Sequence, residues 1–256
     1  MPVVPRKLAR SVKETGKLRP ACVVHSTTTK PPVGTFMRQL KIPAAFIRGG
    51  TSNAIVFKAS DLPARAHWDD LFLAAIGSPD PYGRQLNGMG GGISSLSKVC
   101  VVGPPSRPDA DIDYTFAQVS VGEALVDYGS NCGNMSSAMG PFAVDEGLIT
   151  TARSLLNGET TVRIHNTNTN KVIAARFPIE DGVAAVDGSV EIPGVAGTGA
   201  PVDLDFLEPG GAGTGKLLPT GNLVDQLFVP GLGNIEASLV DAANAFVFVR
   251  AADLGL

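Results

Sequence analysis

Residues 130–146 read SNCGNMSSAMGPFAVDE, and this stretch decides what kind of fold the chain can adopt. Its first residues are polar and turn-forming, and the rest are small or apolar until Asp145. A helix without charged side chains has no face that prefers water, so it must be buried on all sides. We therefore expect a helix from about Cys132 to Glu146 at the centre of the fold.

Short apolar segments before and after this stretch predict strands. Ala44–Arg48 and Ala54–Lys58 are expected to flank a tight turn at residues 49–52, and Lys98–Val102 is expected as a further strand. The remaining expected elements are a helix at 67–76 and strands at 113–121, 124–128, 161–165, 172–177, 227–229, 235–240 and 245–250. Between residues 188 and 221 the chain is rich in Gly and Pro and has few periodic segments.

The overall composition excludes several classes of protein. The 256 residues are 44% hydrophobic and 18% charged, which is typical of a globular chain with a real core. No apolar run approaches the roughly 18 residues needed to span a bilayer, so we expect no membrane insertion. A net charge of −3 argues against nucleic-acid binding. Three cysteines are too few for a disulfide framework or a zinc ribbon, which favours a reducing, intracellular location.

Residues 1–41 form a basic leader with nine Lys and Arg residues and one acidic residue, Glu14. A basic, acid-poor segment that also contains Ser and Thr is typical of a mitochondrial transit peptide, but a disordered tail has the same composition. We therefore expect a cytoplasmic protein, with the mitochondrial matrix as the alternative.

Two glycine-rich motifs and the histidines are not expected to bind nucleotides or metals. Residues 210–217 nearly match the phosphate-binding loop, but Leu217 stands where a magnesium-binding hydroxyl is required. Residues 88–93 miss the dinucleotide fingerprint at Ile93. The three histidines have no mutual metal-ligand spacing, so no metal site is expected; they are His25, His67 and His165.

The loop that enters the expected central helix is the first candidate site. A cysteine at a helix start lies at the positive end of the helix dipole, which favours the thiolate. The unpaired N–H groups of the first turn, with Gly133 clearing space, can hold a carboxylate. The alternative is that Cys132 is a small buried side chain packed near the helix cap, and the spacing alone leaves both interpretations open.

A second candidate lies at residues 90–98, which read GGGISSLSK. Glycines let the main chain approach a ligand closely, and the serines supply hydroxyl donors. Lys98 begins an apolar strand, where partial burial lowers the proton affinity of a lysine and lets it act as a base near neutral pH. The alternative is a lysine at a strand end whose ammonium group reaches water. Cys100 shares the face of Lys98 and is expected to pack.

The third candidate is the turn at residues 48–52, which reads RGGTS. It places a guanidinium group, which suits two-point carboxylate recognition, beside a glycine turn with two hydroxyl groups. The alternative is that Arg48 is a solvated surface residue.

Together, residues 48–52, 80–98 and 131–142 resemble the PrpF family. The family includes 2-methylaconitate cis-trans isomerase, methylitaconate isomerase, oxalomesaconate tautomerase and fungal aconitate isomerase. Residues 214–221 and 241–244 are also similar to it, so the resemblance covers about residues 42–256.

The resemblance implies an α/β (α+β) fold similar to that of diaminopimelate epimerase, with two related domains. Each domain would be a curved mixed sheet wrapped around a central helix, with the active site between them. We then expect an N-terminal domain at 42–188 and the start of a second domain at 189–256. Because family members are longer, this second domain is expected to be incomplete, either in a fragment or in a degenerate relative.

The resemblance further implies a cofactor-independent isomerase that moves a proton and a double bond in an unsaturated di- or tricarboxylate. Lys98 matches the catalytic lysine of the family and Cys132 its cysteine at the helix start. The residues expected to hold the substrate carboxylates are Arg48, Thr51, Ser52, Gly91, Gly92, Ser94, Ser95, Asn131, Gly133, Asn134 and Met135. Asn53-Ala54 replaces the usual Lys-Gly pair of the family, which is expected to shift substrate preference.

Two other functions stay open at this point. One is a non-catalytic accessory role, in which the chain binds a tricarboxylate or a partner dehydratase. The other, weaker, is an amino-acid racemase or epimerase. The exposed apolar edge of an unfinished domain also predicts aggregation or a homodimer.

Overall fold

The computed structural model describes residues 6–7, 21–24, 40–149 and 156–256. Most of the expected basic leader, and therefore its nature, lies outside these residues. The α-helices of the described residues are α1 (Trp68–Ile76) and α2 (Gly133–Asp145), and short 3-10 helices lie at Ala59–Asp61, Arg65–His67, Ser94–Leu96 and Ala251–Leu254. The strands are β1 (Arg6–Lys7), β2 (Ala21–Val24), β3 (Leu40–Pro43), β4 (Ala45–Gly49), β5 (Ser52–Lys58), β6 (Lys98–Gly103), β7 (Ile112–Val119), β8 (Val126–Asp127), β9 (Gly158–Asn166), β10 (Lys171–Glu180), β11 (Val183–Ala184), β12 (Val190–Glu191), β13 (Thr198–Gly199), β14 (Asp203–Phe206), β15 (Asp225–Val229), β16 (Gly233–Ala242) and β17 (Asn244–Val249).

One large mixed sheet forms the body of the described chain. Its strands follow the order β1-β4-β5-β6-β7-β9-β10-β11, with β8 paired to β7 and β14 paired to β10. The β5–β6 and β7–β9 pairs are parallel, and the other pairs are antiparallel. The strands expected around the turn at 49–52 are confirmed as β4 and β5, and the strand expected from Lys98 is confirmed as β6.

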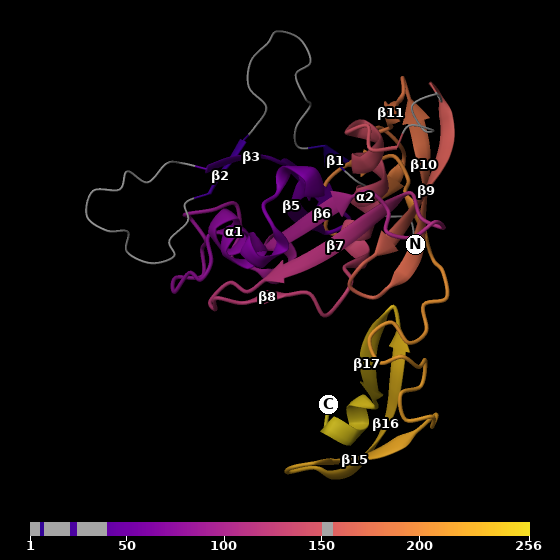
Figure 1. Ribbon diagram of the computed structural model, residues 1–256. Helices are drawn as coiled ribbons and strands as arrows, with labels where there is room; N and C mark the ends of the chain where they lie inside the picture. The colour runs from indigo at the N-terminus through magenta and orange to yellow at the C-terminus, as the bar shows by residue number, and fades with distance from the viewer. Residues whose placement is uncertain (1–5, 8–20, 25–39, 150–155) are drawn as a thin grey trace, which may run out of the picture.

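Helix α2 is the expected central helix, and the sheet curves around it (Figure 1). It contacts strands from both halves of the sheet: β4, β5, β6, β9, β10, β11 and β14. Every side chain from Met135 to Val144 is buried. Small residues allow this close approach, since a Cβ added at Gly140 would lie 2.8 Å from Cε1 of Phe177. The expected α+β class, with a curved mixed sheet around a central helix as in diaminopimelate epimerase, is confirmed.

Helix α1 covers the opposite face of β5, β6 and β7. Its apolar side packs against alternate residues of these strands, including Phe57, Val99 and Val101. The other set of alternate residues, including Val56, Cys100 and Phe116, faces α2. Because both faces are covered, all six residues of β6 are buried. Lys98, the first of them, is therefore held inside the fold by its strand.

The region beyond residue 188 contains strands that the sequence pattern did not predict. They are two to four residues long, too short to show a period, and β14 extends the main sheet by pairing with β10. The last three strands form a separate antiparallel sheet, β15-β16-β17, away from the body in Figure 1. Among the described helices, none is long and apolar enough to cross a membrane.

Candidate active site

The turn between β4 and β5 packs directly on the first turn of α2. The side-chain amide of Asn134 donates to Oγ1 of Thr51 at 3.0 Å and to Oγ of Ser52 at 3.4 Å. Only a glycine fits at Gly49, because an added Cβ would overlap the carbonyl oxygen of Asn134. Arg48 Nη1 donates to the carbonyl of Gly50 at 2.6 Å, which folds the guanidinium group back over the turn. Two of the three candidate stretches are thus in contact.

The main chain around Cys132 is fixed on both sides. Cys132 is the residue before α2, and its carbonyl accepts from the N–H (2.9 Å) and the hydroxyl (3.0 Å) of Ser136. The buried Asn131 accepts a second bond from the Ser136 hydroxyl at 3.2 Å. Asn131 also pairs with Asn244: its N–H donates to Oδ1 and its carbonyl accepts from Nδ2, both at 3.3 Å. The sheet β15–β17 therefore reaches the candidate site through Asn244.

The first turn of α2 offers main-chain N–H groups rather than side chains. It is formed by Gly133, Asn134 and Met135, whose N–H groups precede the first intrahelical bond. The Met135 side chain is fully buried in the core, so only its main chain can face a ligand. An anion at this helix end would be stabilised by these donors and by the helix dipole.

Lys98 is 8% exposed and is held by the neighbouring strand. Its Nζ donates to Oε1 of Gln118 at 2.6 Å and lies 5.1 Å from the centre of the Phe116 ring. The parallel pairing of Ile55 with Val99 places the start of β5, with Ser52, beside the start of β6. Lys98 therefore belongs to the sheet face that α2 covers, as Cys100 and Phe116 do.

The glycine–serine segment before β6 is ordered by a buried glutamine that sequence reasoning missed. Oε1 of Gln85 accepts from the N–H of Gly92 and from the hydroxyl of Ser97, both at 2.8 Å. Gly91 lies against Leu96, and its N–H donates to the Leu96 carbonyl at 3.2 Å. A glutamine in an irregular loop carries no local signal of such a role. The role of Gln85 is visible only in the folded loop, where the main chain surrounds its side chain.

Ser94 and Ser95 lie in the 3-10 helix before β6 and differ in exposure. Ser94 is exposed and Ser95 is half-buried. The Ser94 carbonyl accepts from Nε2 of Gln118 at 3.0 Å. The structure thus connects this segment to Lys98 through a residue on β7 that the sequence motifs did not include.

A buried thiol and phenol lie beneath the Cys132 loop. The Cys100 thiol donates to the Tyr114 hydroxyl at 3.8 Å, and both side chains are fully buried. Burial raises the pKa of Cys100, and the neighbouring Cys132 raises it further. Burial likewise raises the pKa of Tyr114 well above its usual value. Both groups stay protonated at neutral pH, so Cys100 is a packing residue, as expected.

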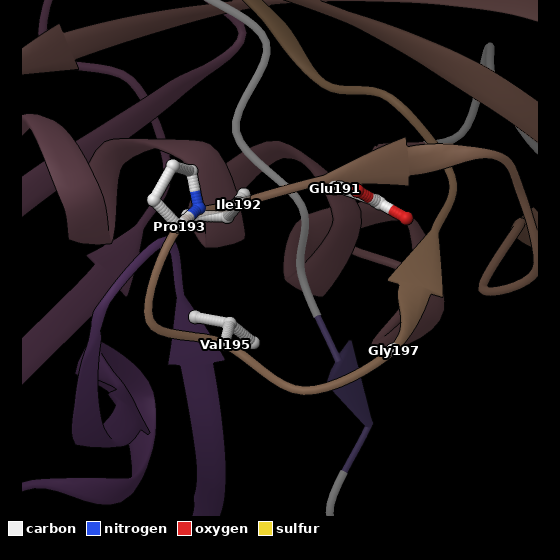
Figure 2. Close-up of a pocket in the computed structure, with 5 residues that line it drawn as sticks. All are labelled: Glu191, Ile192, Pro193, Val195 and Gly197. Atoms are coloured by element: carbon white, nitrogen blue, oxygen red, sulfur yellow. The ribbon is translucent and has the colours of Figure 1, made fainter.

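Two hollows accompany these elements. A cavity of about 370 Å³ is lined by residues 129–131 and 243–246 with Thr169 and Gly213, next to the Asn131–Asn244 contact. A hollow of about 480 Å³ lies at the β12–β13 turn (Figure 2). Its lining is Glu191, Ile192, Pro193, Val195 and Gly197, none of which is a candidate site residue. The first cavity is therefore the one that adjoins the candidate site.

The glycine-rich loop 210–217 has its own partner. Oδ2 of Asp241 accepts from the N–H groups of Gly213 (2.8 Å) and Thr214 (2.6 Å) and from the Thr214 hydroxyl (2.8 Å). Burial alone would raise the pKa of Asp241, but the bonds from Thr214 and Gly213 outweigh it and hold the pKa below its usual value. These donors are occupied by a carboxylate of the same chain.

The described histidines do not form a metal or catalytic group. His165 is buried, and its Nδ1 meets both Asp113 (2.8 Å) and Ser106 (3.2 Å). A Ser-His-Asp triad requires these partners on opposite ring nitrogens, so His165 does not have that arrangement. No three His, Cys, Asp or Glu side chains in the described part of the chain cluster closely enough to hold a metal ion.

With this geometry in place, the comparison with known proteins is direct. Residues 39–256 match the family described as PrpF protein. The chain belongs to the PrpF family. The 3-methylitaconate isomerase of Eubacterium barkeri is 47% identical over 219 residues, which are 85% of this chain and 56% of that protein. The 2-methyl-aconitate isomerase of Cupriavidus necator is 43% identical over 230 residues, 86% of this chain and 58% of that protein.

A solved structure shares the fold of this PrpF-family chain. The crystal structure of a methylitaconate-delta-isomerase matches it with a TM-score of 0.68 at 47% identity, over 84% of this chain and 54% of that one. The PrpF-family chain thus spans a little over half the length of the curated relatives it matches.

Proposed function

We propose that this chain carries the proton-transfer half of an isomerase that moves a double bond in an unsaturated di- or tricarboxylate without a cofactor. The observation that carries the proposal is the placement of Lys98. It is 8% exposed, lies on the sheet face covered by α2, and belongs to the same end of the sheet as the carboxylate-binding groups. The names of the relatives, methylitaconate isomerase and methyl-aconitate isomerase, support the same chemistry.

The substrate carboxylates are held at the N-terminus of α2 and by the turn at residues 48–52. The N–H groups of Gly133, Asn134 and Met135 and the hydroxyl groups of Thr51 and Ser52 supply the donors. Binding a carboxylate there stabilises negative charge, and with it the enolate-like intermediate that forms when an allylic C–H loses its proton.

Lys98 Nζ, in its uncharged form, accepts the allylic proton. The electron pair of that C–H bond moves into the conjugated double bond and carboxylate. A proton then returns to the other end of the allylic system, from the Cys132 thiol or from the Lys98 ammonium group. The product has its double bond shifted, or has changed from cis to trans, with no net gain or loss of atoms.

Proton NMR in D₂O of the purified chain tests this function, with cis-aconitate, 2-methylaconitate and methylitaconate supplied in turn. We expect deuterium to enter the allylic position of at least one substrate, or a new vinyl signal to appear. Saturable binding without exchange, from a chain whose circular dichroism shows it folded, would refute the isomerase and support the accessory role.

Variants assign the two proton-transfer groups. Lys98→Ala is expected to lower the exchange rate by about 10²–10⁴-fold, the usual contribution of an acid–base group. Lys58→Ala is the control, because Lys58 is the last residue of β5 and lies at the other end of this face, where it pairs with Glu146 at the end of α2 at 3.1 Å. A loss of only a few-fold on Lys98→Ala would remove Lys98 from the mechanism. Exchange that survives Cys132→Ala would make Lys98 the residue that returns the proton.

The homodimer and the intracellular location expected from the sequence stay predictions. Size-exclusion chromatography with light scattering tests the first, and fractionation of cells expressing the full chain tests the second.

A further inference from the structure

Gln118 is the polar residue that contacts Lys98, and its orientation is fixed by its other contacts. It stands opposite Lys98 in the β6–β7 register. Its Nε2 donates to the carbonyl oxygens of Ser94 and Ser97, both at 3.0 Å. Two carbonyl acceptors require the NH₂ end of the amide on that side. The oxygen end must therefore face Nζ of Lys98, at 2.6 Å.

The character of this partner matters for a base. An amide oxygen accepts a hydrogen bond from a lysine without adding a full negative charge. A carboxylate at the same distance would favour the ammonium form strongly. The ion pairs of the described residues do not include Lys98. Gln118 therefore orients Lys98, and none of these ion pairs supplies a carboxylate to its ammonium group.

The other titratable groups on this face do not take the place of Gln118 as the hydrogen-bond partner of Lys98. Burial keeps Cys100 and Tyr114 protonated, and Asp127, opposite Gln118 on β8, accepts the N–H of Gly129 at 2.8 Å. The titratable groups nearest to Lys98 by register and face are Cys100 of β6 and Tyr114 of β7 in the core that α2 covers, Cys132 packed against that core, and the exposed Asp127, which pairs with Gln118 from β8.

We propose that Gln118 is a positioning residue for Lys98: its amide oxygen directs Nζ, while its NH₂ group ties Lys98 to the 3-10 helix Ser94–Leu96. The inference rests on the proposed function, in which Lys98 removes the substrate proton. It adds that the base and the serine segment are held by one side chain, and that this side chain is an uncharged amide.

The first test uses Gln118→Glu and reads Lys98 without any substrate. Acetic anhydride labels uncharged amines, so the extent of acetylation of the Lys98 peptide, measured by mass spectrometry across pH, gives the pH at which Lys98 becomes reactive. We expect this midpoint to rise by about one unit or more in Gln118→Glu, since a nearby opposite charge favours the ammonium form. Lys58 in the same molecule is the internal reference and should not move.

Gln118→Met is the second variant, because it loses the same two donor bonds to the Ser94 and Ser97 carbonyl groups as Gln118→Glu does and differs from it only in what it presents to Lys98. Methionine keeps a similar length but offers Lys98 no oxygen, so the midpoint should fall. If Gln118 had only a structural role, the Glu and Met substitutions would not shift the Lys98 midpoint in opposite directions. Gln226→Glu, at an exposed position on β15, is the matched control and should leave the Lys98 midpoint unchanged.

The second test follows deuterium exchange in the same variants. The rising limb of the pH–rate profile should move to higher pH in Gln118→Glu, with kcat at pH 7 lowered at least about tenfold and KM within about threefold. If the Lys98 labelling midpoint shifts but the chain never exchanges deuterium, the proposed function is refuted and the contact between Gln118 and Lys98 is supported. If the chain exchanges deuterium but the Lys98 labelling midpoint does not move in folded Gln118→Glu or Gln118→Met, the role of Gln118 is refuted.

Discussion

Replacing Gly49 by Ala tests how tightly the turn at residues 48–52 is locked on α2. A Cβ at this position would overlap the Asn134 carbonyl oxygen and lie 3.1 Å from both Asn134 C and Met135 Cα. These are main-chain atoms of a buried helix, so no side-chain rotation relieves the contact, and overpacking of this kind costs about 1–3 kcal/mol. If the turn moves away, the 3.0 Å bond from Asn134 to Thr51 is lost as well, at about 1 kcal/mol.

We therefore expect Gly49→Ala to lower the free energy of unfolding by about 2–4 kcal/mol. With an m-value of about 3 kcal/mol per M, the midpoint of urea unfolding should fall by about 0.7–1.3 M. Circular dichroism of the whole chain measures it. Gly122→Ala is the matched control, because no atom lies within 4 Å of its Cβ position. Equal stability of the two variants, within about 0.5 kcal/mol, would show that the turn does not rest on α2 as described.

Three further predictions concern the core, the glycine-rich loop and the loop before Cys132. Met139→Ala should cost about 2–5 kcal/mol in chemical unfolding, because Met139 is fully buried in the core around α2; a cost below 1 kcal/mol would contradict that packing. Asp241→Asn should be less stable than the parent at pH 7. Because the folded state lowers the pKa of Asp241, its contribution is fully present above about pH 4 and is lost as the pH falls below that value through the lowered pKa. The difference in thermal unfolding between the two proteins should therefore shrink below about pH 4. A stability difference that does not change with pH would contradict this role of the Asp241 carboxylate. Asn244→Ala should speed hydrogen exchange at the Asn131 amide at least about tenfold by mass spectrometry; unchanged protection would mean that the two asparagines are not paired in solution.

The sequence alone determined the parts of this protein that depend on local pattern. The absence of charge in residues 130–144 was enough to place a buried central helix, because such a helix has no face for water. The glycines at 49–50 and the apolar runs on either side were enough for the β4–β5 turn. The resemblance of three stretches selected Lys98 and Cys132, and the fold places them on elements that share one face of the sheet.

The tertiary structure decided which side chains meet. Gln118 contacts Lys98 across 20 residues of sequence, and Asn244 contacts Asn131 across 113. Neither residue belongs to a local period or motif of its partner, since strand register and chain closure bring them together. The glycine-rich loop makes the same point: its local sequence suits an anion, but only the fold shows that the anion is the carboxylate of Asp241. Local spacing reports propensity, whereas the partner of a buried polar group is fixed by packing.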